Sequence, residues 1–166
     1  MIYLIWLLRI IHIGAGIFWV GGSLILSFFV APSIGAMGES GPKFMSHLMN
    51  NLKFNSRMAA ASGASILAGL ILFWLDARAG TAWLRSDFAT GLSIGAGFAL
   101  VGFVFGILIG RTSKAMAQLG AQIQGKPTSE QLTQMQAIQK RMATYSNLSS
   151  VMLILAVIFM AIARYM

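Results

Sequence analysis

Residues 10–32, IIHIGAGIFWVGGSLILSFFVAP, form the stretch that decides the fold. No residue in it carries a formal charge, and a helix of about 20 such residues crosses a bilayer. The stretch therefore predicts a membrane-spanning helix. His12 lies inside it, and Gly16 and Trp19 follow one and two helical turns later on the same face. Because a polar ring at membrane depth is costly, this face is the first candidate for function.

The composition extends this prediction to the whole chain of 166 residues. Hydrophobic residues make up 57% and charged residues 10%, whereas about 25% is typical of soluble domains. We therefore expect a single integral membrane domain over residues 1–166, all-α, with aqueous loops too short for a soluble catalytic domain.

The formal net charge of +8 does not indicate a nucleic-acid partner. The basic residues gather at the ends of the apolar stretches, where they meet lipid headgroups, and they form no continuous polar face. The expected partner is the lipid bilayer, with no nucleic acid. Cysteine is absent, which excludes disulfides, thiolate metal centres and covalently attached haem.

Hydropathy divides the chain into four spans that form a helical bundle. No basic stretch precedes the first apolar run, so we expect a retained span rather than a cleaved signal. Pro32 and Gly35 are expected to end it, residues 33–43 to form a loop, and residues 44–57 to form an amphipathic helix at the membrane interface. The expected spans cover about residues 2–31, 58–75, 88–110 and 145–163.

The polar stretch 111–144 between the last two spans also has a helical pattern. Thr128 and Gln131 are spaced as a capping box. Beyond them, one apolar stripe can face another across a turn, and we expect a helical hairpin that extends spans three and four into the cytoplasm. The two stripes are Leu132, Met135, Ile138 and Met142, and Ala115, Leu119 and Ile123.

Lysine and arginine counts orient the bundle. Segments 32–57 and 111–144 together hold eight of these residues, and the opposite side holds four, namely Arg9, Arg78, Arg85 and Arg164. Because cytoplasmic loops carry the excess, both termini are expected outside a bacterial-type inner membrane.

Spans two and three carry small residues at four-residue spacing, such as Ser65 with Gly69 and Gly91 with Gly95. These faces let helices approach closely in lipid. They serve either packing within the chain or a homo-oligomer seam, and a larger membrane complex is a further alternative.

His12 has two interpretations. It can be the axial ligand of haem b, with Gly16 leaving room for the macrocycle and Trp19 packing beside it. Alternatively it is hydrogen-bonded to a carbonyl or a serine hydroxyl of a neighbouring helix. A second axial ligand is not specified: Met160, a partner's histidine and five-coordinate iron all remain open.

His47 is the other histidine, and it lies near the opposite membrane face, since 19 helical residues from His12 to Ala31 rise about 28 Å. If Met45, His47 and Met49 were extended they would share a face and could bind Cu(I). On a helix His47 points away from the two methionines, and the flanking pattern favours a helix.

The acidic residues offer no catalytic pair. Glu39, Asp76, Asp87 and Glu130 all lie outside the spans, so no residue is assigned a catalytic role and glycosidase, protease or carboxylate-based transport chemistry is not indicated.

The first half of the chain resembles a known group. The residues Ile11-His12, Phe18 to Gly22 and Phe28 to Pro32, with Phe54-x-x-Arg57 and Ala68-Gly69-Leu70 further on, resemble the first two spans of the CopD-like and HemJ-like small membrane proteins. The resemblance covers roughly residues 10–75. It implies a helical bundle that holds haem b through the first-span histidine, here His12, with roles in copper uptake, porphyrinogen oxidation or unassigned functions.

One departure matters. A histidine or lysine that the resemblance places in a later span is missing from residues 88–110. This departure leaves porphyrinogen oxidation without support, and copper passage is supported only by Met45, His47 and Met49. From His12 and the resemblance together we expect a haem-b-binding membrane protein that acts in electron transfer or porphyrin handling, with an unknown redox partner. A cofactor-free structural subunit of a membrane complex and a copper-handling protein are the alternatives.

Overall fold

The protein is a set of long helices, seen in a computed structural model that describes residues 2–38, 40–78, 80–123 and 125–166. Glu39, one of the four acidic residues, lies outside them. All elements of the described residues are helical, and four helical stretches are long and apolar enough to cross a membrane. These stretches are Ile2–Ala36, Phe54–Ala77, Asp87–Gln122 and Ser129–Tyr165. The expected all-α architecture with four long apolar helices is confirmed.

The first stretch does not end at Pro32, and that expectation was wrong. It runs as α1 (Ile2–Ile25), the π-helical η1 (Leu26–Val30) and α2 (Ala31–Ala36) without a break. The wider π turn lets a new α-helical stretch begin at Ala31, where Pro32 sits in the first turn and its missing N–H costs little. The hydroxyl of Ser33 donates to the carbonyl of Phe29 at 2.7 Å.

Residues 33–53 are also mostly helical, which corrects the expected loop 33–43 and the expected single helix 44–57. α2 ends in a turn at Gly38, where φ is +54°, and is followed by α3 (Ser40–Ser46) and the π-helical η2 (His47–Asn51). Lys53 then takes a left-handed conformation with φ of 50°, and this breaks the helix four residues earlier than expected.

The helix that holds the second expected span is therefore longer than expected, by four residues at its start and two at its end. α4 (Phe54–Ala77) begins directly after Lys53, and a short α5 (Thr81–Leu84) lies in the following turn. The third expected span forms the first part of α6 (Asp87–Ala121). The Ser86 hydroxyl accepts from the N–H of Ala89 at 3.2 Å and so caps the start of this helix.

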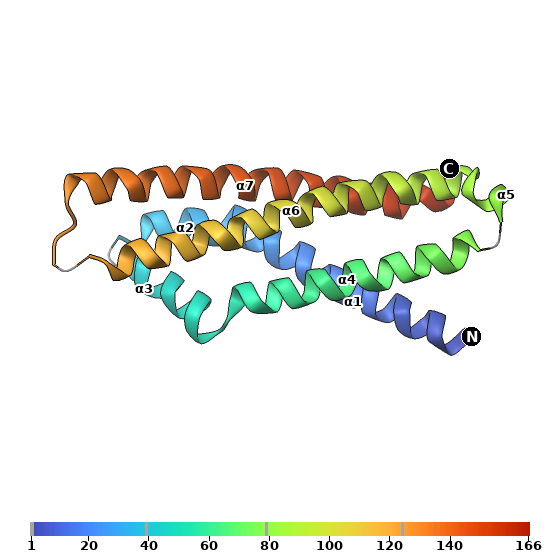
Figure 1. Cartoon of the computed structure of the whole chain (residues 1–166), viewed down its shortest axis with the longest axis horizontal. Helices are drawn as coiled ribbons and strands as arrows, with labels where there is room; N and C mark the ends of the chain where they lie inside the picture. The colour runs from blue at the N-terminus through green and yellow to red at the C-terminus, as the bar shows by residue number, and fades with distance from the viewer. Residues whose placement is uncertain (1, 39, 79, 124) are drawn as a thin grey trace.

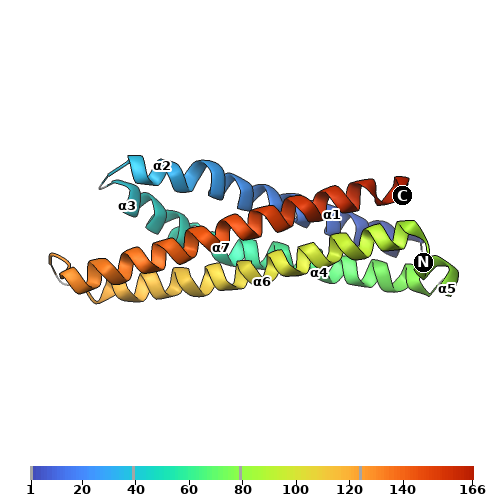
Figure 2. The ribbon, with the colours of Figure 1, turned by 90° about the horizontal axis from the view of Figure 1, so that it is seen from above.

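The last two spans continue as one long antiparallel pair. α7 (Ser129–Ile162), followed by a 3₁₀ turn at Ala163–Tyr165, runs back along α6 over its whole length (Figures 1 and 2). The predicted capping box is confirmed: Thr128 Oγ1 accepts from Gln131 N at 3.2 Å, and Gln131 Oε1 accepts from Thr128 N at 2.9 Å.

The four long stretches pack as two pairs. α1 packs along α4, and α6 packs along α7, while the two pairs meet through fewer residues. Glycines of α6 bring α7 close: a Cβ on Gly95 would lie 2.8 Å from Met160 Cγ, and one on Gly102 would lie 3.0 Å from Leu153 Cδ2. Small residues thus serve packing within the chain here.

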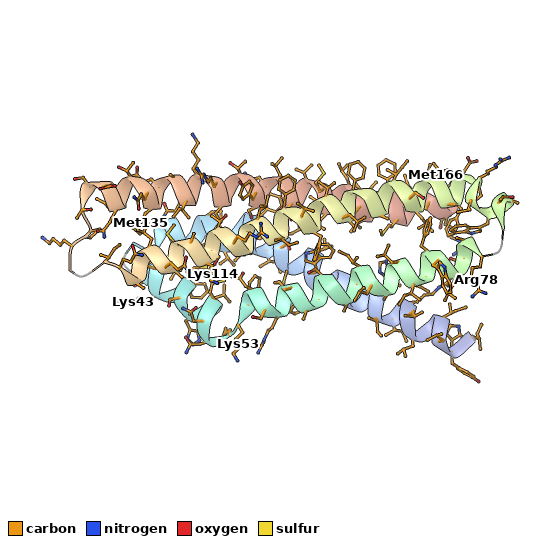
Figure 3. The ribbon with its side chains drawn as sticks, viewed as in Figure 1. Lys43, Lys53, Arg78, Lys114, Met135 and Met166 are labelled. Carbon is orange, nitrogen blue, oxygen red and sulfur yellow. The ribbon has the colours of Figure 1, made fainter. Side chains whose placement is uncertain are left out.

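Large apolar side chains cover the outer surface of the bundle. Ile17, Leu67 and Phe29 are each more than 60% exposed. So much exposed apolar surface is typical of helices that face lipid. Figure 3 shows Lys43, Lys53 and Lys114 toward the hairpin end of the molecule, with Arg78 and Met166 toward the other end.

Candidate functional site

The candidate site lies where α1 meets α4, at His12. The imidazole is half-buried, and its Nδ1 lies 2.7 Å from the backbone carbonyl oxygen of Ser65. A carbonyl oxygen can only accept, so Nδ1 carries the proton that is donated. In the neutral ring, Nε2 is then left with its lone pair.

Gly69 provides the space for this contact. A Cβ at position 69 would lie 2.7 Å from Cε1 and 2.8 Å from Nδ1 of His12, too close for any side chain. The helical geometry explains the position: the carbonyl of residue 65 points along the helix toward residue 69, so a side chain that reaches this carbonyl must pass over residue 69.

The contact is reciprocal. The buried hydroxyl of Ser65 donates to the backbone carbonyl of His12 at 3.0 Å, and it lies 3.4 Å from Nδ1. It passes over Gly16, where a Cβ would lie 3.2 Å from Ser65 Oγ. Each helix therefore contributes one polar side chain and, four residues later, one glycine. The space left by Gly16, which the haem interpretation gave to the macrocycle, admits Ser65.

Trp19 lies on the same face two turns from His12, but it belongs to a different contact. It is 6% exposed and meets Phe103 of α6 edge to face, with ring centroids 6.2 Å apart and planes at 89°. His12 and Gly16 thus join α1 to α4, whereas Trp19 joins α1 to α6.

The surroundings of His12 hold no cluster of metal-ligating side chains among the residues that the structure describes. These residues contain no group of three or more His, Cys, Asp or Glu side chains that could hold a metal ion. Met160 packs against Gly95 between α6 and α7. His47 begins η2, directly after α3, and Figure 1 shows α3 toward the end of the bundle opposite the N-terminus.

The Cu(I) candidates are helical, as the flanking pattern favoured. Met45 lies in α3, and His47 and Met49 lie in η2. His47 is exposed, while both methionines are half-buried. The extended arrangement that would place all three side chains on one face is not adopted.

Of the two interpretations of His12, the structure shows the hydrogen bond to a neighbouring helix directly. In the sequence, Ser65 and Gly69 stand out as part of a small-residue face, and Gly69 also as part of the resemblance, but neither indicates a contact with His12. The available signal was the matching spacing of His12 with Gly16 and of Ser65 with Gly69.

No family model, curated protein or solved structure matches this chain.

Proposed function

We propose that this chain is a multi-pass membrane protein that binds haem b through Nε2 of His12 and acts in electron transfer or porphyrin handling. The observation that carries the proposal is the hydrogen bond from His12 Nδ1 to the carbonyl of Ser65. In this proposal the protein lies in a bacterial-type inner membrane with both termini outside. The excess of Lys and Arg in segments 32–57 and 111–144 supports this orientation.

The hydrogen bonding of His12 suits an axial ligand. Histidines that ligate a metal donate their other ring N–H to a carbonyl, a carboxylate or water, which fixes the tautomer and makes the ligating nitrogen more basic. His12 has this arrangement, with Gly69 leaving the ring no competing side chain beside it. Imidazole is also the commonest axial ligand of non-covalent haem, which needs no cysteine. Bound haem would supply one-electron redox chemistry.

The resemblance of residues 10–75 to the CopD-like and HemJ-like group supports the same assignment. In that group the first-span histidine holds haem b, and His12 occupies the matching position. The missing histidine or lysine in span three leaves the group's porphyrinogen oxidation without support here.

Absorption spectroscopy tests the proposal. Protein purified from cells supplied with haem precursor should show a Soret band, which His12→Ala should abolish and His47→Ala should retain. His47 is an apt control because it is exposed and lies in η2, outside the contact between α1 and α4. A colourless wild-type protein, or a band that survives His12→Ala, contradicts the proposal.

A cofactor-free structural subunit is the second candidate, and one observation favours it. The side chains of His12 and Ser65 each donate to the other residue's backbone carbonyl. The pair can therefore act purely as a polar link between α1 and α4. In that case the purified protein is colourless, His12→Ala lowers stability without a spectral change, and partner chains co-purify.

A further inference from the structure

A cavity separate from His12 lies among the four long helices. Its volume is about 250 Å³, and α1, η1, α4, α6 and α7 all contribute to its wall. Trp19, Ser27, Asn55, Phe103, Gly106 and Ser146 are among the lining residues. His12 is not, so a ligand here would be independent of the haem proposal.

Hydroxyl groups form one side of the cavity. Ser27 Oγ lies 2.6 Å from Ser146 Oγ, and the buried Ser150 donates to Ser27 at 3.1 Å. Two hydrogen bonds join three hydroxyls, so one of the three O–H donors is left over. Because Ser150 already donates, the remaining donor belongs to Ser27 or Ser146, both of which line the cavity. Ser27 lies in the π-helical turn η1, a type of distortion that is frequent at functional sites.

The rest of the wall is uncharged. Ser23, Asn55, Ser62 and Ser149 add polar groups, and the remaining lining residues are apolar, aromatic or glycine. Asn55 donates to Ser113 at 3.2 Å, and Ser149 donates to the carbonyl of Gly102 at 3.2 Å. No Lys, Arg, Asp, Glu or His is among the described lining residues, so the wall offers nothing to balance an ionic ligand.

Aromatic rings form another part of the wall. Trp19 and Phe103 line the cavity in an edge-to-face pair. A flat ring packs well against such side chains. The volume is below the 300–1,000 Å³ or so of pockets for drug-sized ligands, which suits a single-ring head group.

We propose that this cavity binds the head ring of a lipid-soluble quinone, with a ring carbonyl accepting the free hydroxyl donor of the Ser27–Ser146 pair and the ring face packing near Trp19 and Phe103. A quinone is uncharged, planar and dissolves in the membrane, and its carbonyl oxygens match hydroxyl donors. The proposal concerns binding and includes no electron transfer.

Gly106 allows a sharp test, because it lines the cavity and a Cβ there would meet nothing within 4 Å. Gly106→Leu should therefore fill the cavity without a clash at its first atom. Gly97→Leu is the matched control: it lies on the same helix α6, is exposed, and has equally open space outside the cavity.

Trp19 fluorescence reports binding once the other three tryptophans are replaced, as Trp6→Phe, Trp74→Phe and Trp83→Phe, in protein that also carries His12→Ala so that no haem at His12 quenches Trp19. Decylubiquinone added to this protein in nanodiscs should quench Trp19 saturably. Gly106→Leu should weaken the apparent affinity by about tenfold or more, as expected when a side chain occupies the site, and Gly97→Leu should leave it unchanged. Circular dichroism and gel filtration should show that both variants remain folded.

Three results would overturn the proposal. The first is quenching that rises linearly with quinone concentration, as partitioning into lipid would give, and the second is equal affinity in both leucine variants. The third is a phospholipid that co-purifies with the wild type, is not displaced by quinone and is lost in Gly106→Leu. If Gly106→Leu fails to fold, Ser27→Ala with Ser146→Ala replaces it, and unchanged affinity there contradicts the hydroxyl contact. The Soret band plays no part in these readouts, so failure here and failure of the haem proposal are distinguishable.

Discussion

At the scale of single residues, the contact between His12 and Ser65 depends on two missing Cβ atoms, those of Gly16 and Gly69. In each helix the carbonyl that accepts the bond points toward the residue four positions later, and only glycine there leaves the carbonyl accessible from the side. The histidine is thereby held by backbone geometry, which also fixes the nitrogen that stays free.

The sequence predicted part of this site. It singled out His12 because an imidazole at membrane depth needs a partner, and it placed Gly16 on the same face. It could not assign the partner, because several serines in three other spans had equal claim and span pairing is a property of the whole bundle. The haem ligation itself remains a prediction.

Gly69→Ala should disrupt the site more than its size suggests. The new Cβ would lie 2.7 Å from His12 Cε1, so either the ring or α4 must move, and we expect a loss of about 1–3 kcal/mol in unfolding free energy. If haem is bound, the Soret band should weaken as well. Unfolding in SDS, followed by circular dichroism, measures the loss.

Gly63→Ala is the matched control on α4, because a Cβ at position 63 would meet nothing within 4 Å. This variant should be neutral or slightly more stable, since alanine favours the helix over glycine by about 1 kcal/mol. Equal stability of the two variants would mean that the imidazole does not lie over Gly69.

At the scale of helices, local chemistry predicted what is local. The capping box at Thr128 and the existence of four long apolar helices follow from residues close together in sequence. The end of the first helix could not be predicted from local sequence. A proline normally ends a helix, but here the π turn before Pro32 accommodates it. The break at Lys53 had a sequence signal: the apolar pairs 44/45 and 48/49 predict apolar residues at 52 and 53, but position 53 is lysine and the next apolar residue is Phe54.

Thr128→Ala tests the cap of α7. It removes the acceptor of the Gln131 N–H and one half of the reciprocal box, so the first turn of α7 should lose about 1 kcal/mol, or about fivefold in local opening. Hydrogen exchange of the amides in residues 129–134 should become faster by that factor. Thr133→Ala, which removes only an exposed bond to the Ser129 carbonyl, should leave these rates nearly unchanged.

At the scale of the whole molecule, two helix pairs create both sites. α1 with α4 forms the histidine contact, while the junction of this pair with α6 and α7 leaves the cavity. Composition predicted the four apolar helices, but no local pattern states which helices pair. The cavity was therefore not predictable from sequence, although Ser27, Ser146 and Gly106 were each visible as small residues within or near spans.

The orientation of the bundle in the membrane can be measured by labelling introduced cysteines, because the chain contains none of its own. Figure 3 shows Lys43, Lys53 and Lys114 toward the hairpin end, and eight of the twelve Lys and Arg residues lie in the two segments at that end. The excess of positive charge should retain this end in the cytoplasm.

A cysteine introduced as Gln134→Cys, on the exposed surface of the hairpin, should then react with an impermeant maleimide only after the membrane is permeabilised. Thr81→Cys, at the exposed start of α5, is the counterpart and should react in intact cells or spheroplasts. The reverse labelling pattern would place both termini inside and would move the cavity at Ser27 and Asn55 from the cytoplasmic half of the bundle to the outer half.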